Sequence, residues 1–134
     1  IGRERWAQII SQGIPQEKAT DLFDSWFLRL GIEDKSIAPL AQNWPFDSAM
    51  LKVLFGHAHF NRYFFGHYRD TMSTASYLND RADFSGEQTP FPKLGLGSLA
   101  AKLGIEIDGM LHDAIYDCKV VAQVYKSMIL HPVL

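Results

Sequence analysis

Two aspartates lie at positions where a helix that faces a protein core normally carries an apolar residue. The first, Asp47, opens an apolar row with the spacings of one helix face. This row continues through Met50, Leu51 and Leu54. The second, Asp117, opens a row with the same spacings, which continues through Val120, Val121, Val124 and Met128. The pattern predicts that both carboxylates point inward.

Carboxylates that point inward need a partner, because an isolated buried charge is so costly that it protonates, pairs with a cation or binds a metal. No Lys or Arg partner is evident near either row. If the two helices face each other, two carboxylates about 4 Å apart repel by about 4 kcal/mol at an effective dielectric constant of about 20, and a divalent cation reverses this repulsion. The sequence therefore favours a metal site at Asp47 and Asp117. The alternative is that each aspartate is a helix N-cap near solvent.

The composition fits one globular domain over residues 1–134, since 47% of the residues are hydrophobic. The formal net charge of −2 argues against a protein that coats long stretches of nucleic acid, which requires a basic face, but it allows a nuclease that holds a few nucleotides. Cys118 is the only cysteine, so no internal disulfide can form and a reducing, cytoplasmic location is expected. We expect no membrane partner, because no segment is long and apolar enough to span a bilayer.

The helix predicted over residues 15–31 has the clearest pattern, with Pro15 near its first turn and Gly31 at its end. Its apolar face is predicted to consist of Ala19, Leu22, Phe23, Trp26, Phe27 and Leu30. Residues 36–42 predict a short strand, and Pro39 within it favours an edge or irregular position. After the Asp47 helix, residues 57–69 predict a helix end followed by a strand.

Three more elements complete the predicted order. Asp70 and Thr71 are expected to cap a helix over residues 72–79, and residues 83–92 form a polar loop. Residues 96–103 predict a short amphipathic helix that ends at Gly104. The Asp117 helix closes the chain.

Four motifs follow one another along about two-thirds of the chain. They are NWPFD at 43–47, DT at 70–71, LGSLAAKLGI at 96–105 and HDAIYD at 112–117. This ordered set resembles the DEDDh class of 3′-to-5′ exonucleases, the proofreading-type and ribonuclease T-like enzymes of the ribonuclease H-like superfamily. No single motif is decisive, and the resemblance depends on their order and spacing.

The resemblance implies an α/β domain of ribonuclease H-like fold, with a central mixed sheet and flanking helices. It implies a hydrolase that removes nucleotides from the 3′ end of single-stranded DNA or RNA. Asp47 and Asp117 would be catalytic ligands of Mg²⁺ or Mn²⁺ in a two-metal site, for which carboxylate oxygens are suitable. His112 would be the general base that takes a proton from the attacking water, because its ordinary pKa is close to neutrality.

The groove for the terminal nucleotide is expected beside the first metal ligand. The resemblance implies that Asn43 and Phe46 help to shape it, and for Phe46 a core position is the favoured prediction. Trp44 is adjacent and is the one tryptophan that we expect to stack on a base. We therefore take these three residues as candidate substrate contacts.

The chain departs from the family pattern in two places. The family's first motif, an Asp-x-Glu on the first strand, is not found, and Gln42 stands where the family commonly has His. We therefore expect an N-terminally incomplete domain that lacks its first strands and holds half of a metal site. Such a fragment leaves the apolar face of the 15–31 helix uncovered, so further chain, a homo-oligomer or a partner chain is expected to cover it.

Two other functions remain open. One is a catalytically incomplete nucleic-acid-binding or interaction module. The other is an HD-type metal phosphohydrolase, in which His112 and Asp113 act together with His57 or His59. A zinc site at the histidines is not predicted, because no cysteine lies at ligand spacing from them.

Overall fold

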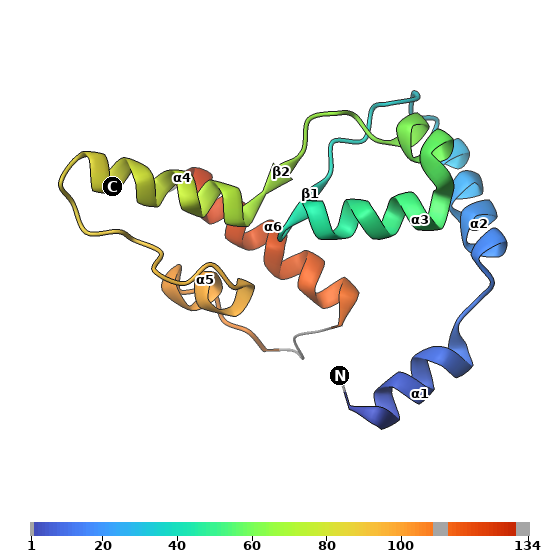
Figure 1. The fold of residues 1–134 in the computed structure, drawn as a ribbon, viewed down its shortest axis with the longest axis horizontal. Helices are drawn as coiled ribbons and strands as arrows, with labels where there is room; N and C mark the ends of the chain where they lie inside the picture. Colours follow the sequence, from blue (N-terminus) through green and yellow to red (C-terminus); the bar gives the residue numbers. More distant parts are fainter. Residues whose placement is uncertain (1, 109–112, 131–134) are drawn as a thin grey trace. The chain divides into compact units, whose positions relative to one another are not determined.

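The computed structural model describes residues 2–108 and 113–130. This part of the chain is mostly helical, with one small parallel sheet, and is broadly α/β (Figure 1). The helices are α1 (Arg3–Gln12), α2 (Gln16–Arg29), α3 (Trp44–Tyr63), α4 (Thr71–Phe84), α5 (Leu96–Lys102) and α6 (Ala114–Leu130). The strands are β1 (Leu40–Ala41) and β2 (Arg69–Asp70).

The packing divides into two compact units, which are described separately. The first unit comprises the chain up to Ile37 together with Ala49–Phe64, and the second comprises Ala38–Ser48 and the chain from Phe65 onward. The sequence prediction of one domain over residues 1–134 stays a prediction, because compact packing units are not by themselves separate domains.

Aromatic side chains form the core of the first unit. The ring of Phe23 on α2 lies 4.8 Å from the rings of both Phe55 and Tyr63 on α3, measured between centroids. The side chain of Tyr63 is fully buried, and its hydroxyl donates a hydrogen bond of 2.5 Å to Asp24. Burial and this bond raise the pKa of Tyr63, so the hydroxyl stays protonated and the bond is kept across the physiological range.

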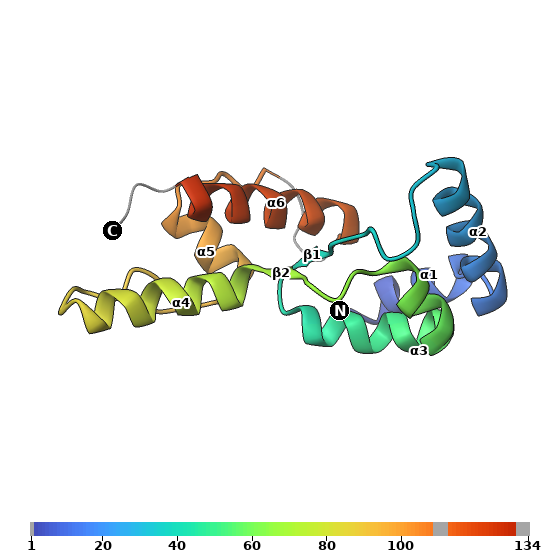
Figure 2. The ribbon, with the colours of Figure 1, turned by 90° about the horizontal axis from the view of Figure 1, so that it is seen from above.

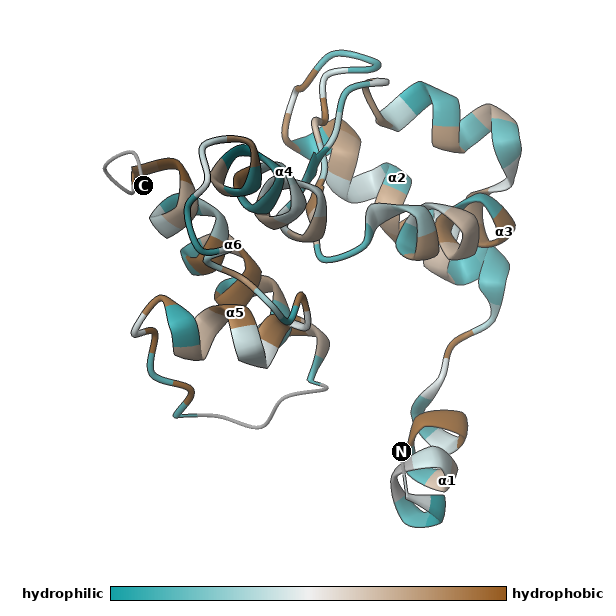
Figure 3. Ribbon diagram, turned by 60° about the vertical axis from the view of Figure 1, so that its left-hand side comes forward, coloured by the Kyte–Doolittle hydropathy of each residue, from teal (hydrophilic) through white to brown (hydrophobic). Residues whose placement is uncertain are grey.

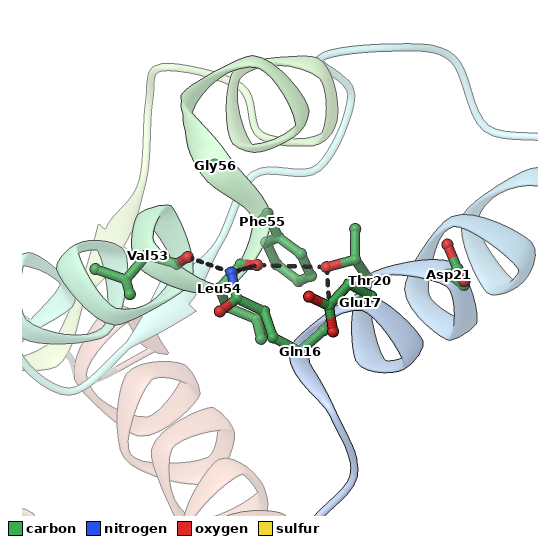
Figure 4. A pocket seen from close by; sticks show the side chains of 8 residues that line it. All are labelled: Gln16, Glu17, Thr20, Asp21, Val53, Leu54, Phe55 and Gly56. Atoms are coloured by element: carbon green, nitrogen blue, oxygen red, sulfur yellow. Dashed lines mark hydrogen bonds between the residues drawn. The ribbon is translucent and has the colours of Figure 1, made fainter.

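Helix α3 is interrupted at Gly56, whose φ of 73° and ψ of 158° are not helical. Ending a helix leaves its last carbonyl groups without intrahelical partners. Here the Gln16 side-chain amide donates to the carbonyl oxygens of Val53 and Leu54, both at 2.9 Å, as Figure 4 shows. The hydroxyl of Thr20 also donates to Leu54. The start of α2 therefore caps the interrupted end of α3.

The second unit contains the sheet. Strands β1 and β2 pair in parallel, with Leu40 opposite Arg69 and Ala41 opposite Asp70. Helix α6 contacts β1, α4 and α5 (Figures 1 and 2). Figure 3 shows hydrophobic residues on α5 and α6, where the core of this unit lies. The buried core residues are Ala75, Phe91, Leu99, Ala100, Val120, Val124 and Met128.

The second unit confirms several predicted elements. All four apolar residues of the Asp117 row are buried in α6. Asp70 caps α4 as predicted, and the predicted 96–103 helix is α5. The predicted strand over 36–42 is reduced to an isolated bridge at Ile37 and the two residues of β1. The described residues contain only the β1–β2 sheet, whereas the resemblance implied a larger mixed sheet.

Two further predictions have mixed outcomes. Residues 57–63 form the end of α3, which resumes after Gly56 and packs its aromatic residues onto α2, and a bridge at Phe64 and strand β2 follow. The predicted order of a helix end and then a strand is confirmed, although the strand has only two residues. On the face predicted for α2, Phe27 is buried, but Leu22, Trp26 and the C-cap residue Leu30 are exposed. They are exposed because this helix is covered over a narrower stripe, centred on Phe23 and Phe27, than its sequence predicted.

Within the described ranges, no helix has the length and apolarity needed to cross a membrane.

We expect Gly56→Ala to destabilise the protein. A Cβ at this position has no neighbour within 4 Å, so the cost comes from the backbone conformation alone. This φ/ψ region is essentially restricted to glycine, and forcing another residue into it costs about 1–3 kcal/mol. Urea denaturation followed by circular dichroism measures this loss.

Gly66→Ala is the matched control, because a Cβ there also meets open space while the backbone φ is not positive. An equal free energy of unfolding for both variants would contradict the strain at Gly56.

Candidate functional site

The candidate site is built around the carboxylate of Asp70, at the end of β2. Oδ2 of Asp70 accepts a hydrogen bond of 2.5 Å from the backbone N–H of Trp44, the first residue of α3. Oδ1 accepts a bond of 3.0 Å from the backbone N–H of Ser73, in the first turn of α4. Asp70 is only 4% exposed. One buried carboxylate therefore caps two helices, and the positive ends of both helix dipoles stabilise its charge.

A second set of hydrogen bonds fixes the same corner. The hydroxyl of Thr71 bonds to the side-chain oxygen of Gln42 and to the backbone oxygen of Ala41, the latter at 3.4 Å. The amide nitrogen of Gln42 donates to the carbonyl oxygen of Leu94 at 2.6 Å. Gln42, which the sequence marked as a departure from the family pattern, thus links the end of β1 to the start of α4 and to the loop before α5.

Asp47 lies in the first turn of α3 and is half-buried. Its apolar row is confirmed in part: Leu51 and Leu54 are partly buried against the core, but Met50 is 57% exposed. The buried residues Trp44 and Phe55 shift the centre of the covered stripe away from Met50. Asp47 is at the edge of this stripe, so its carboxylate is partly desolvated without being enclosed.

The pKa of Asp47 is raised above its ordinary value. Burial is the largest cause, and the negative charge of Asp70 adds to it, while a hydrogen bond from the backbone of Asp47 itself acts in the opposite direction. Among the described residues, the ion pairs are those of Arg62 with Asp24 and Asp34. Asp47 therefore has a carboxylate neighbour and no ion pair with a described Lys or Arg, which is the electrostatic situation that a divalent cation relieves.

Asp117 lies in the first turn of α6 and is half-buried. It does not hold the cap position, because the Asp113 carboxylate accepts the hydrogen bond from the Tyr116 backbone N–H, at 3.0 Å. The N-cap alternative thus applies to Asp113 and not to Asp117. The predicted general base, His112, lies outside the described residues.

The described residues contain no group of three or more His, Cys, Asp or Glu side chains placed to share a metal ion. The structure places Asp47 within the electrostatic influence of Asp70, an acid that the sequence predicted only as a helix cap. The joint use of Asp47 and Asp117 as metal ligands stays a prediction. Carboxylate oxygens are the donor type that Mg²⁺ and Mn²⁺ require, so the donor chemistry fits these ions.

The three candidate substrate contacts have different surroundings. Asn43 is exposed, adopts a left-handed φ of 66° and lines an open pocket together with Asp70. Phe46 is 61% exposed, so its expected core position was wrong: it lies on the side of α3 away from the covered stripe. Trp44 is 9% exposed and its ring lies 6.2 Å from that of Tyr68, which leaves little surface for stacking on a base.

Of the residues that line this pocket, the sequence analysis named only Asn43 as a site candidate and missed the residues that α4 contributes, Tyr77 and Asp80 among them. A signal was present, because positions 73, 77 and 80 fall on one face of the helix that Asp70 caps. The helix was predicted to end at residue 79, so Asp80 was not placed on it.

Comparison with protein-family models, with curated proteins and with solved structures gives no match for this chain.

We expect Asp47→Asn to raise the melting temperature at pH 7 by about 1–3 °C. The folded-state pKa of Asp47 is above the ordinary value of 3.8, so the ionised side chain disfavours the folded state. This penalty is absent below pH 3.8 and appears as the pH rises through the folded-state pKa. Thermal unfolding of both proteins between pH 3 and pH 8 should therefore show a gain that disappears in acid.

Glu106→Gln removes the same charge from an exposed residue and should leave the melting temperature nearly unchanged. A pH-independent gain for Asp47→Asn, or a loss at pH 7, would contradict the electrostatic origin.

Proposed function

We propose that this chain is part of a metal-dependent 3′-to-5′ exonuclease of ribonuclease H-like fold. The enzyme would hydrolyse phosphodiester bonds at the 3′ end of single-stranded DNA or RNA. The observation that carries the proposal is the half-buried Asp47, whose pKa is raised by burial and by repulsion from the Asp70 carboxylate and which forms no ion pair with a described cationic side chain. Asp47 and Asp117 are proposed as ligands of Mg²⁺ or Mn²⁺, and His112 as the general base.

The local geometry supports a fixed ligand at position 47. The start of α3 is attached to Asp70 through Trp44, and Asp70 is held by β2 and α4. A carboxylate three residues into such a helix has little freedom to move away from a bound cation. Rigid support of this kind is what a metal-binding catalytic residue needs.

The position of α6 supports the second ligand. Its buried residues are Val120, Val121, Val124 and Met128. Asp117 continues this stripe toward the start of the helix, so it begins at the boundary between the core and solvent. Helix α6 also contacts β1, which is followed within three residues by α3. Both proposed ligands are thus carried by elements anchored on the same two-stranded sheet.

A bound divalent cation would activate water and stabilise the leaving oxygen in phosphodiester hydrolysis. The chain's own contribution is to hold the cation through Asp47 and Asp117 and to accept a proton from the attacking water at His112. The order of the NWPFD, DT and HDAIYD motifs supports this division of roles.

The test uses a 5′-labelled single-stranded oligonucleotide incubated with the protein in Mg²⁺ or Mn²⁺. We expect products shortened one nucleotide at a time from the 3′ end. Asp47→Asn and Asp117→Asn should lower the rate at least 100-fold, because each removes a metal ligand. His112→Ala should lower the rate while leaving Mn²⁺ binding in place.

Glu106→Gln serves as the control for loss of a negative charge and should keep the wild-type rate. Undiminished hydrolysis in both aspartate variants would overturn the assignment. Binding of the oligonucleotide without hydrolysis in either metal would instead support the alternative, a catalytically incomplete nucleic-acid-binding module.

A further inference from the structure

The pocket beside Asp70 has a lining that none of the proposed catalytic steps uses. Its volume is about 450 Å³, and it is bounded by the start of α3 and by one face of α4. The α4 residues that line it are Met72, Ser73, Ser76, Tyr77 and Asp80. Asn43 and Pro45 line the α3 side. This volume is sufficient for one planar heterocyclic ring with room for its attached sugar.

The lining combines a flat aromatic ring with polar groups. Tyr77 is 64% exposed although it lies in the middle of a helix, so its ring is available to a ligand. Met72 adds a polarizable apolar side chain, and the Ser76 hydroxyl and the Asn43 amide can each donate or accept hydrogen bonds. An exposed aromatic platform with hydrogen-bonding groups around it is typical of a site that stacks and reads a nucleobase.

The charges of the pocket determine which part of a nucleotide can enter. Asp70 and Asp80 line it, and Asp47 lies close to Asp70. Carboxylates repel phosphate groups and accept hydrogen bonds from amino groups, as they do from the exocyclic amine of cytosine. The base should therefore occupy the pocket while the phosphates stay outside it, where a cation at Asp47 would attract them.

We propose that this pocket binds a nucleobase bearing an exocyclic amino group, with Tyr77 stacking on the base and Asp80 accepting a hydrogen bond from its amine. The proposal rests on the proposed function, since the bound base would belong to the strand whose 3′ end lies at Asp47. It adds a preference for cytosine over uracil, which differ in the hydrogen-bonding groups at N3 and C4.

The test measures binding separately from hydrolysis. Fluorescence anisotropy of labelled dC8 and dU8 is recorded in EDTA, so that no metal-dependent cleavage occurs. We expect the wild-type protein to bind dC8 several-fold more tightly than dU8. Tyr77→Ala should weaken dC8 binding about 5- to 150-fold, the range for loss of one stacked base, while Tyr77→Phe should keep the affinity.

Phe84→Ala is the matched control, because Phe84 is a 91% exposed aromatic residue on the same helix and does not line the pocket. It should leave dC8 binding unchanged. Asp80→Ala should remove most of the preference for dC8 over dU8. Circular dichroism of each variant checks that α4 remains folded.

Equal affinity for dC8 and dU8, an equal effect of Tyr77→Ala and Phe84→Ala, or no detectable binding of either oligonucleotide would overturn the inference. Its failure is distinguishable from that of the exonuclease proposal. If the oligonucleotide is hydrolysed but Tyr77→Ala does not weaken binding, only the base pocket is overturned. If binding depends on Tyr77 and favours cytosine but no hydrolysis occurs in Mg²⁺ or Mn²⁺, only the enzymatic function is overturned.

Discussion

The hydrogen bonds of Asp70 are the interaction on which the candidate site depends. A single buried carboxylate accepts backbone N–H groups from the first residue of α3 and from the first turn of α4. Unpaired N–H groups at a helix start would otherwise remain in a poorly hydrated corner, and leaving one unsatisfied costs about 1–3 kcal/mol. The carboxylate thus fixes both helix starts, and with them the positions of Asp47 and of the pocket along α4.

This arrangement has an electrostatic consequence. Asp70 accepts hydrogen bonds from two helix starts, whose dipoles favour a negative charge there. Asp47 is in the same region without those partners, and its pKa is raised by burial and by the charge of Asp70. The site therefore pairs one hydrogen-bonded acid with one whose charged form is disfavoured, and a bound cation would offset that cost.

Local signals in the sequence predicted much of this corner. The Asp70 cap, the short helix α5 and the buried row of α6 were predicted correctly, because each follows from the spacing of residues that are near one another in the sequence. The proximity of Asp47 to Asp70 could not be predicted, because it arises from the pairing of β1 with β2, which brings residues 41 and 70 together. The exposure of Phe46 and Met50 depends on which stripe of α3 is covered, and this is decided by the position of Trp44. The helix end within residues 57–69 was predicted, but the interruption at Gly56 was not, because it depends on how the two parts of α3 pack onto α2.

The most direct test of the account is whether Asp47 binds a divalent cation. Electron paramagnetic resonance of a Mn²⁺ titration reports bound metal without requiring turnover. The account predicts that the wild-type protein binds Mn²⁺ and that Asp47→Asn weakens this binding at least tenfold, while Glu106→Gln leaves it unchanged. Equal Mn²⁺ affinity in the wild-type and Asp47→Asn proteins would contradict the account.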